Sequence, residues 1–276
     1  MRPSRGDLHT GKPMGVVYTD LMAGLASASD GGFALTIPDS WMQGRSTYGG
    51  LSAAIGLKAA EASFPNLPPL RSMQVSFIGP VGGDITIKTE LLRQGRSVTF
   101  VGADIYGEKG LGARSVFAFG QARPSLFNER HLPAPQASAP DDALLLQKHE
   151  GLAKFAYNFS TYIAGGGVPF SDSKDIESVY WVRHNDDQAN DMAALIALAD
   201  MPPPALSARF PEFAPISSMT WHVNVLTDAP HTDDGLWLMR VFAEDAKDGY
   251  SSQDMTMWSK AGELTMTMRQ SVAIFV

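Results

Sequence analysis

One carboxylate in the chain stands where it could act on a bound water. Asp200 directly follows the apolar residues 192–199 and comes two residues before Pro202, Pro203 and Pro204. Prolines fix the backbone, so we expect a rigid setting for this side chain. Such a carboxylate can serve as a general base or orient a water. The alternative is an aspartate that caps a turn at a helix end, although a negative charge there opposes the helix dipole and favours a functional role.

A glutamine in the last strand-like segment is the second candidate. The amide of Gln270 can both donate a hydrogen bond to a water and accept one from it. Strand alternation puts Gln270 on the same face as Val272 and Ile274, which the pattern assigns to the core. A core glutamine needs a partner, and a water bound in a site would supply one. The alternative is a glutamine at a strand edge that faces solvent.

A pair of glycines precedes the longest helix-forming segment. Gly49 and Gly50 offer backbone N–H groups at the start of that segment, where developing negative charge is stabilised. The alternative is a simple packing requirement at the start of a buried helix. Tyr48 and Arg45 flank the glycines and are candidate substrate-binding residues.

Several other chemistries lack their residues. The chain has no cysteine, and neither a G-x-S-x-G nor an H-E-x-x-H pattern occurs. We therefore predict no thiolate or serine nucleophile, no metal and no cofactor. His222 lies beside Trp221 without a nucleophile or a paired aspartate, so a packed histidine is favoured over a catalytic one.

Composition indicates a folded enzyme-sized protein. The 276 residues are 44% hydrophobic and 18% charged, and the net charge of −7 argues against nucleic acid as a partner. Residues 1–20 are polar, and no stretch approaches the roughly 18 apolar residues of a membrane helix. We expect a cytoplasmic protein that does not bind a membrane.

The chain repeats one pattern of elements. In the first half we expect a helix over residues 51–62 and strands over residues 32–37, 72–78, 84–92, 97–106 and 113–119. In the second half we expect a helix over residues 192–199 and strands over residues 155–162, 179–183, 218–226, 237–243, 252–258 and 264–275. Both halves end in similar hairpins, Tyr106 to Phe119 and Trp258 to Phe275, which indicates a duplication. The predicted units are residues 1–123 and 151–276, joined by a proline-rich linker over residues 124–150.

Five motifs in order then resemble the TesB-like acyl-CoA thioesterases. They are the run from Gln43 to Gly50 with its alanine-rich helix, the run from Val75 to Val81, the run from Arg93 to Ser97, the segment from Ala199 to Ala205, and Arg269-Gln270. The resemblance covers roughly residues 30–275. It implies an α+β double hotdog fold, with two antiparallel sheets that each wrap around a central helix.

The resemblance also implies a catalytic set, and here the chain departs from the family. The family uses an Asp, a Gln and a Thr to position the attacking water, which matches Asp200 and Gln270. At the Thr position the chain has Ile216, followed by Ser217 and Ser218, either of which is a candidate for the missing hydroxyl. A shift of one residue along a strand reverses the face, so the two serines are not equivalent.

The implied activity is hydrolysis of an acyl-CoA to a free acid and CoA, without a covalent intermediate. A hotdog hydratase is the nearest enzymatic rival, but we expect no Asp–His pair beside either helix. The rival from another class is a degenerate hotdog protein that binds acyl-CoA or a protein partner. Arg96 could contact CoA phosphates or lie in solvent, and Met255, Met257, Met266 and Met268 could line an acyl tunnel or be ordinary core. Unpaired strands at the edges of a sheet can pair with a second copy of the chain, so a homo-oligomer stays an open alternative.

Overall fold

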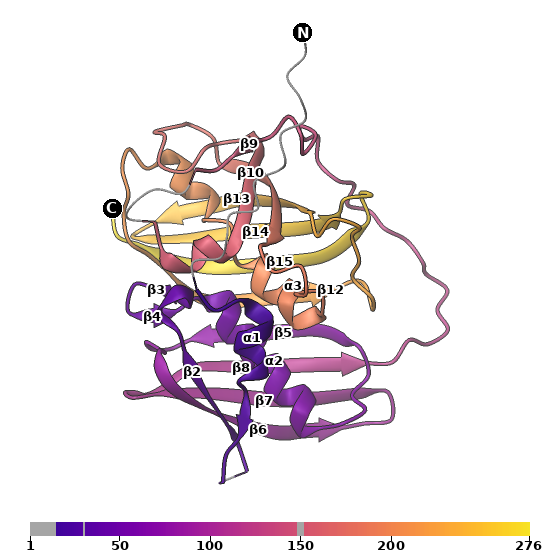
Figure 1. Ribbon diagram of the computed structural model, residues 1–276. Coiled ribbons are helices and arrows are strands. Elements are labelled where there is room, and N and C mark those ends of the chain that lie inside the picture. Colours follow the sequence, from indigo (N-terminus) through magenta and orange to yellow (C-terminus); the bar gives the residue numbers. More distant parts are fainter. Residues whose placement is uncertain (1–14, 30, 148–151) are drawn as a thin grey trace.

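The computed structural model describes residues 15–29, 31–147 and 152–276 (Figure 1). Residues 1–14, which make up most of the polar N-terminal segment, lie outside the described residues. So does the predicted boundary between residues 150 and 151.

The first half contains the predicted helix and all five predicted strands. Its elements are α1 (Tyr18–Ala23), β1 (Ala26–Ser27), β2 (Phe33–Ile37), the 3-10 turn η1 (Asp39–Trp41), β3 (Met42–Gln43), β4 (Ser46–Thr47), α2 (Gly49–Ser63), β5 (Leu70–Phe77), β6 (Gly83–Gln94), β7 (Val98–Gly107) and β8 (Gly110–Gly120). The short elements α1, β1, β3 and β4 carry too few residues for a periodic pattern, so the sequence did not indicate them.

One expected strand of the second half is only partly formed, and three short elements there were not expected. Its elements are β9 (Leu144–Leu145), η2 (Lys154–Asn158), β10 (Phe159–Gly166), β11 (Glu177–His184), α3 (Met192–Ala199), η3 (Ala205–Arg209), β12 (Ile216–Val225), β13 (Trp237–Lys247), β14 (Tyr250–Ser259) and β15 (Leu264–Ile274). The strand predicted over residues 155–162 was wrong in its first part, which forms η2. There the Phe155 ring stacks on Tyr48 and the Asn158 amide donates to the Ser40 carbonyl, so contacts with the first half replace strand pairing.

The strands form one large sheet instead of the two expected from the sequence. Among the described residues, thirteen strands pair in the order β1-β2-β6-β7-β8-β5-β12-β15-β14-β13-β11-β10-β9, and β3 pairs with β4 separately. The two halves are joined where β5 and β12 pair antiparallel, with Val75 opposite Trp221. This pairing gives hydrogen-bond partners to two edges that separate sheets would leave open.

The two halves share one strand order. Read outward from the joint, the first half runs β5-β8-β7-β6-β2 and the second runs β12-β15-β14-β13-β11. In each half the helix precedes the strand at the joint. This order agrees with the internal repetition of the sequence.

The two principal helices pack against each other at the centre of the molecule (Figure 1). Helix α2 is buried over most of its circumference because its side chains are small or aliphatic, and α3 is buried from Ala193 to Ala199. The Asp191 side chain caps the start of α3 by accepting a hydrogen bond from the Ala194 N–H. No helix in the described ranges is long and apolar enough to cross a membrane.

The segment expected to be a linker covers part of the second half. Carbonyl groups of Leu132 and Ser138 accept hydrogen bonds from the indoles of Trp258 and Trp181. Both tryptophans belong to a small apolar cluster that is separate from the main core. Residues 132–145 therefore shield the face of the sheet opposite the one that packs against α3.

Candidate active site

The end of α3 meets the start of α2, and Asp200 lies at this junction. Asp200 is the C-terminal cap residue of α3, and its carboxylate accepts a hydrogen bond from the Gly50 backbone N–H. Gly49 and Gly50 are the first two residues of α2, whose N–H groups have no acceptor within the helix. A charge that would be unfavourable at the end of α3 is thus placed at the favourable end of α2.

The glycine pair is required by this close approach. A Cβ atom on Gly49 would lie 2.9 Å from Asp200 Oδ2, and one on Gly50 would lie 2.6 Å from the Ala197 carbonyl oxygen. Both distances are shorter than side chains tolerate. The two glycines therefore have a packing role, and the same packing brings the N–H groups of α2 to the carboxylate.

Strand β15 supplies the second hydrogen bond to the carboxylate. Gln270 is 4% exposed, and its side-chain Nε2 donates to Asp200 Oδ1. Its Oε1 accepts from the Nε2 of Gln253 at 2.8 Å and faces the Ser218 hydroxyl at 3.4 Å. Sequence alternation predicted an inward Gln270 that needs a partner, and the partner in the structure is Asp200.

Gln253 was missed by the sequence analysis. It lies on β14 directly opposite Gln270 in the register and is 1% exposed. The signal that marked Gln270 was present for Gln253 too, since a polar residue stands in a strand whose inward positions also hold Met255 and Met257.

Burial dominates the acidity of the central carboxyl. Desolvation raises the pKa of Asp200 to about 7, while the hydrogen bonds from Gln270 and Gly50 act in the opposite direction. Part of the residue remains accessible to solvent, so water can reach the junction. A carboxyl that titrates near pH 7 is suited to exchange a proton with a water.

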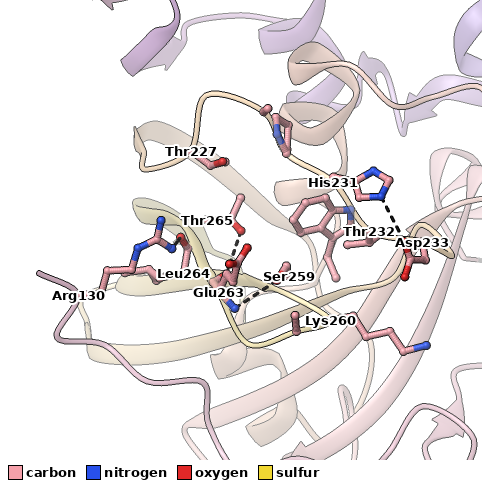
Figure 2. Close-up of a pocket in the computed structure, with 14 residues that line it drawn as sticks. Arg130, Thr227, His231, Thr232, Asp233, Ser259, Lys260, Glu263, Leu264 and Thr265 are labelled. Atoms are coloured by element: carbon pink, nitrogen blue, oxygen red, sulfur yellow. Dashed lines mark hydrogen bonds and ion pairs between the residues drawn. The ribbon is translucent and has the colours of Figure 1, made fainter. Parts of the chain in front are cut away.

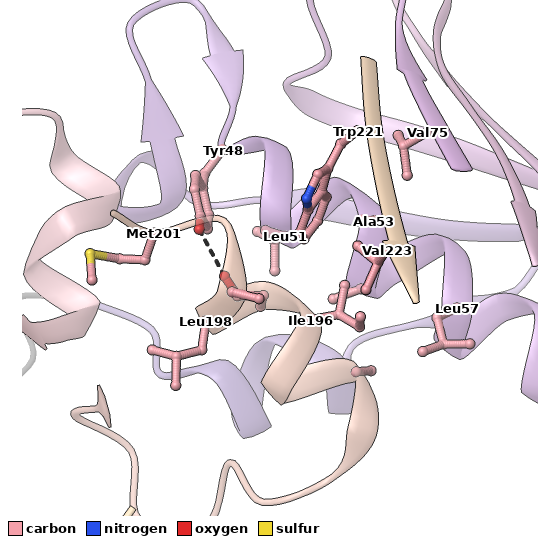
Figure 3. Close-up of a cluster of buried hydrophobic side chains, with 14 of the residues drawn as sticks. Tyr48, Leu51, Ala53, Leu57, Val75, Ile196, Leu198, Met201, Trp221 and Val223 are labelled. Carbon is pink, nitrogen blue, oxygen red and sulfur yellow. Dashed lines mark hydrogen bonds between the residues drawn. The ribbon is translucent and has the colours of Figure 1, made fainter. Parts of the chain in front are cut away.

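Tyr48 fixes the two helices at this junction (Figure 3). Its hydroxyl donates to the Ala197 carbonyl of α3 at 2.8 Å, and its ring stacks on Phe155 with centroids 4.0 Å apart. Burial first, and then the charge of Asp200, raises the pKa of Tyr48 well above its usual range. Tyr48 is therefore a neutral donor held inside the core.

The structure separates the two candidate serines. Ser218 pairs with Val272 and lies on the face of Gln270, whereas Ser217 pairs with Ala273 and is exposed. A β-bulge between Ser218 and Thr220 changes the phase of β12, so Ser218 and Trp221 face the same way although they are three residues apart. Sequence alternation alone could not reveal this bulge.

The remaining candidates lie away from the carboxylate or point to solvent. Arg45 is exposed in the turn between β3 and β4. Arg96 lines a hollow of 320 Å³ with Phe64, at the far end of the 15-residue α2, about 22 Å from Gly49 along the helix axis. His222 is half-buried and alternates with the inward-facing Trp221 and Val223, so it lies on the other face of the sheet.

A buried histidine lies beside α3, where the sequence predicted no Asp–His pair. His184 at the end of β11 lies 2.8 Å from the Ala194 carbonyl of α3, near the end of that helix away from Asp200. Burial lowers its pKa to about 4, so the ring is neutral at pH 7. Among the described residues its hydrogen-bond partner is this backbone carbonyl and not a carboxylate, so it does not form the Asp–His pair of a hydratase.

An open pocket of 480 Å³ lies elsewhere on the second half (Figure 2). It is bordered by Arg130, the loop around His231, and the β14–β15 turn at Lys260. Neither Asp200 nor Gln270 lines it. The four methionines considered for an acyl tunnel are at most 2% exposed and form part of the main core.

Comparison with protein families places the chain among thioesterases. Residues 37–120 match the acyl-CoA thioesterase N-terminal domain, and residues 129–274 match the acyl-CoA thioesterase C-terminal domain. The chain therefore belongs to the acyl-CoA thioesterase family, in agreement with its resemblance to TesB-like proteins. No curated protein matches it.

Solved structures show that the hotdog architecture is shared. A conserved protein of unknown function from Alicyclobacillus acidocaldarius, described as a hotdog fold, superposes with a TM-score of 0.82 at 24% identity, covering 95% of this chain and 99% of that one. A TesB protein from Mycobacterium avium subspecies paratuberculosis gives 0.75 at 16% identity, covering 94% and 99%. The acyl-CoA thioesterase II TesB2 from Mycobacterium marinum gives 0.74 at 15% identity, covering 93% and 97%.

Proposed function

We propose that the protein is an acyl-CoA thioesterase that hydrolyses its substrate through a water held at Asp200. The observation that carries this proposal is the Asp200 carboxylate, fixed by Gln270 and Gly50, with its pKa raised to about 7. Membership of the acyl-CoA thioesterase family supplies the substrate class.

In the proposed reaction, the oxygen of the water attacks the thioester carbonyl carbon while Asp200 takes the proton of the water. Gln270 keeps the carboxylate oriented through its hydrogen bond to Oδ1. The C–S bond then breaks, and the CoA thiolate receives the proton that Asp200 holds. No covalent acyl-enzyme is involved, because the attacking group is water.

The developing oxyanion needs a donor, and Gly49 suits this role better than Gly50. The Gly50 N–H already donates to Asp200, and Gly50 is buried. Gly49 occupies the first position of α2, so its N–H points out of the helix start, and the residue is only half-buried. Donors that are fixed in advance at the start of a helix stabilise such a charge without reorganisation.

Ser218 is the candidate for the hydroxyl that the family's threonine supplies, since Ile216 stands at the threonine position. The Ser218 hydroxyl lies 3.4 Å from Gln270 Oε1, on the side of the glutamine away from Asp200. This arrangement supports a hydroxyl contribution from Ser218 even though Ile216 precedes it by two residues. It also favours hydrolysis over the alternative of a degenerate protein that only binds acyl-CoA.

The test is release of free CoA thiol from a panel of short, long and aromatic acyl-CoAs by the wild type, Asp200→Asn and Gln270→Ala. We expect wild-type turnover, and a loss of about 10²–10⁴-fold in Asp200→Asn if the carboxylate is the base. Thermal melting of each variant checks that the fold is retained.

Two results would contradict the proposal. Full activity in both folded variants would remove Asp200 and Gln270 from the mechanism. An absence of wild-type turnover, combined with an acyl-CoA-dependent rise in melting temperature, would instead establish the binding protein, because a ligand of the native state stabilises it.

A further inference from the structure

We propose that Gln253 is a positioning residue that sets the orientation of the Gln270 amide and thereby keeps the Asp200 carboxyl ready to accept a proton. This inference rests on the proposed function and extends it to a residue of β14 that does not touch Asp200. The chain of hydrogen bonds runs from Gln253 to Gln270 to Asp200 across β14, β15 and the end of α3.

The direction of the chain follows from the chemistry of each group. A carboxylate only accepts hydrogen bonds, so the NH₂ group of Gln270 must face Asp200. The Gln270 carbonyl oxygen then points the other way and needs donors. Gln253 Nε2 supplies one at 2.8 Å, and the Ser218 hydroxyl lies at a longer 3.4 Å.

Gln253 is itself held in one orientation. Its Nε2 also donates to the Met255 sulfur at 3.6 Å, which is an acceptor and cannot donate. The side chain is 1% exposed, so solvent does not compete for its amide. Both contacts of this nitrogen require the NH₂ group of Gln253 to face Gln270 and Met255.

The orientation of Gln270 matters because Asp200 exchanges a proton. When Asp200 is protonated, its O–H could donate to a reversed Gln270, with the amide oxygen toward the carboxyl. That reversed arrangement would stabilise the protonated carboxyl and withdraw the base. Gln253 opposes the reversal, since a reversed Gln270 would place one NH₂ group against another.

Among the groups that face Asp200, the Gln270 amide is the one whose orientation can reverse. Gly50 contributes a backbone N–H, and Tyr48 contributes a neutral phenol whose hydroxyl is committed to the Ala197 carbonyl. Among the described residues, no charged side chain contributes to the pKa shift of Asp200.

The experiment compares Gln253→Met and Gln253→Glu with the wild type. The first removes the donor at similar length beside Met255, and the second puts an acceptor in its place. Ser251→Ala is the matched control, because Ser251 is buried two residues away on the same strand and its hydroxyl makes no hydrogen bond within the described part of the chain. We expect the acid limb of the pH–kcat profile to move up by about one pH unit in Gln253→Met, a loss of about fivefold at pH 7, with KM little changed. Gln253→Glu shifts it further, and Ser251→Ala leaves it in place.

A second readout separates this inference from the proposed function. The ¹³C resonance of the Asp200 carboxyl is assigned as the one that disappears in Asp200→Asn. Its chemical shift follows the titration of this carboxyl in the absence of substrate. An upward shift in Gln253→Met supports the positioning role even if the wild type hydrolyses no acyl-CoA, a result that would refute only the proposed function. A folded Gln253→Met that titrates like the wild type overturns the inference, as does a fall in kcat without any movement of the pH midpoint.

Discussion

The side-chain amide of Gln270 donates a hydrogen bond to the carboxylate of Asp200, and this contact joins β15, the last strand along the chain, to the end of α3. The two residues are 70 positions apart in the chain. Their meeting depends on the end of α3 reaching both β15 and the start of α2.

The rate of hydrolysis is expected to rise with pH through neutrality. The active base is the ionised carboxylate, and burial raises the pKa of Asp200 to about 7, so the base is lost as pH falls through that value. A pH profile of kcat between about 5 and 9 measures the midpoint of the acid limb. A midpoint near 4, the ordinary range of an aspartate, would contradict a desolvated catalytic carboxyl.

Gly50→Ala is expected to disrupt the junction, whereas Gly56→Ala in the same helix is not. The new Cβ at position 50 would lie 2.6 Å from the Ala197 carbonyl oxygen, and backbone cannot yield without moving α3. We expect a loss of about 1–3 kcal/mol in the free energy of unfolding and a large loss of turnover.

The matched change at position 56 meets only ordinary contacts, the nearest being Phe117 at 3.4 Å. Alanine is the better helix former, so stability is expected to stay level or to rise by up to about 1 kcal/mol. Urea unfolding of both variants makes the comparison. Equal stabilities for the two would show that α2 and α3 do not approach as closely as described.

Ser218→Ala and Ser217→Ala are expected to differ, although the residues are neighbours. Ser218 shares the inner face with Gln270, while Ser217 is exposed on the other face. Removing one weak donor to Gln270 is expected to lower kcat by about 2–10-fold, consistent with a neutral hydrogen bond of about 0.5–1.5 kcal/mol. The Ser217 change is expected to leave kcat unaltered. Thiol-release kinetics test both, and the opposite ranking would place the bulge of β12 elsewhere.

Local patterns in the sequence were sufficient for most of the elements. The helix over residues 192–199 has the predicted bounds, since eight apolar helix formers stand between Asp191, which caps the start, and the prolines that follow Asp200. The alternation that placed Gln270 inward was also correct, because inward and outward positions in a long strand differ in polarity.

Long-range pairing decided what the sequence left open. The single continuous sheet arises because β5 and β12 satisfy each other's edge hydrogen bonds, and no local pattern records which edges will meet. The bulge after Ser218 reverses the faces of both serines relative to Trp221, so that Ser218 points inward and Ser217 outward, and this is a property of the pairing with β15.

The sequence by itself determined most of the longer elements, the inward position of Gln270 and the family that the motifs resemble, because each of these depends on neighbouring residues or on recurrent motifs. The tertiary structure alone decided which polar groups touch. Asp200, Gln270, Gln253 and Gly50 come from four separate elements, and their hydrogen bonds exist only because the helices and strands pack at van der Waals distance. The same packing removes most of the water from around Asp200, and this desolvation is what raises its pKa toward neutrality.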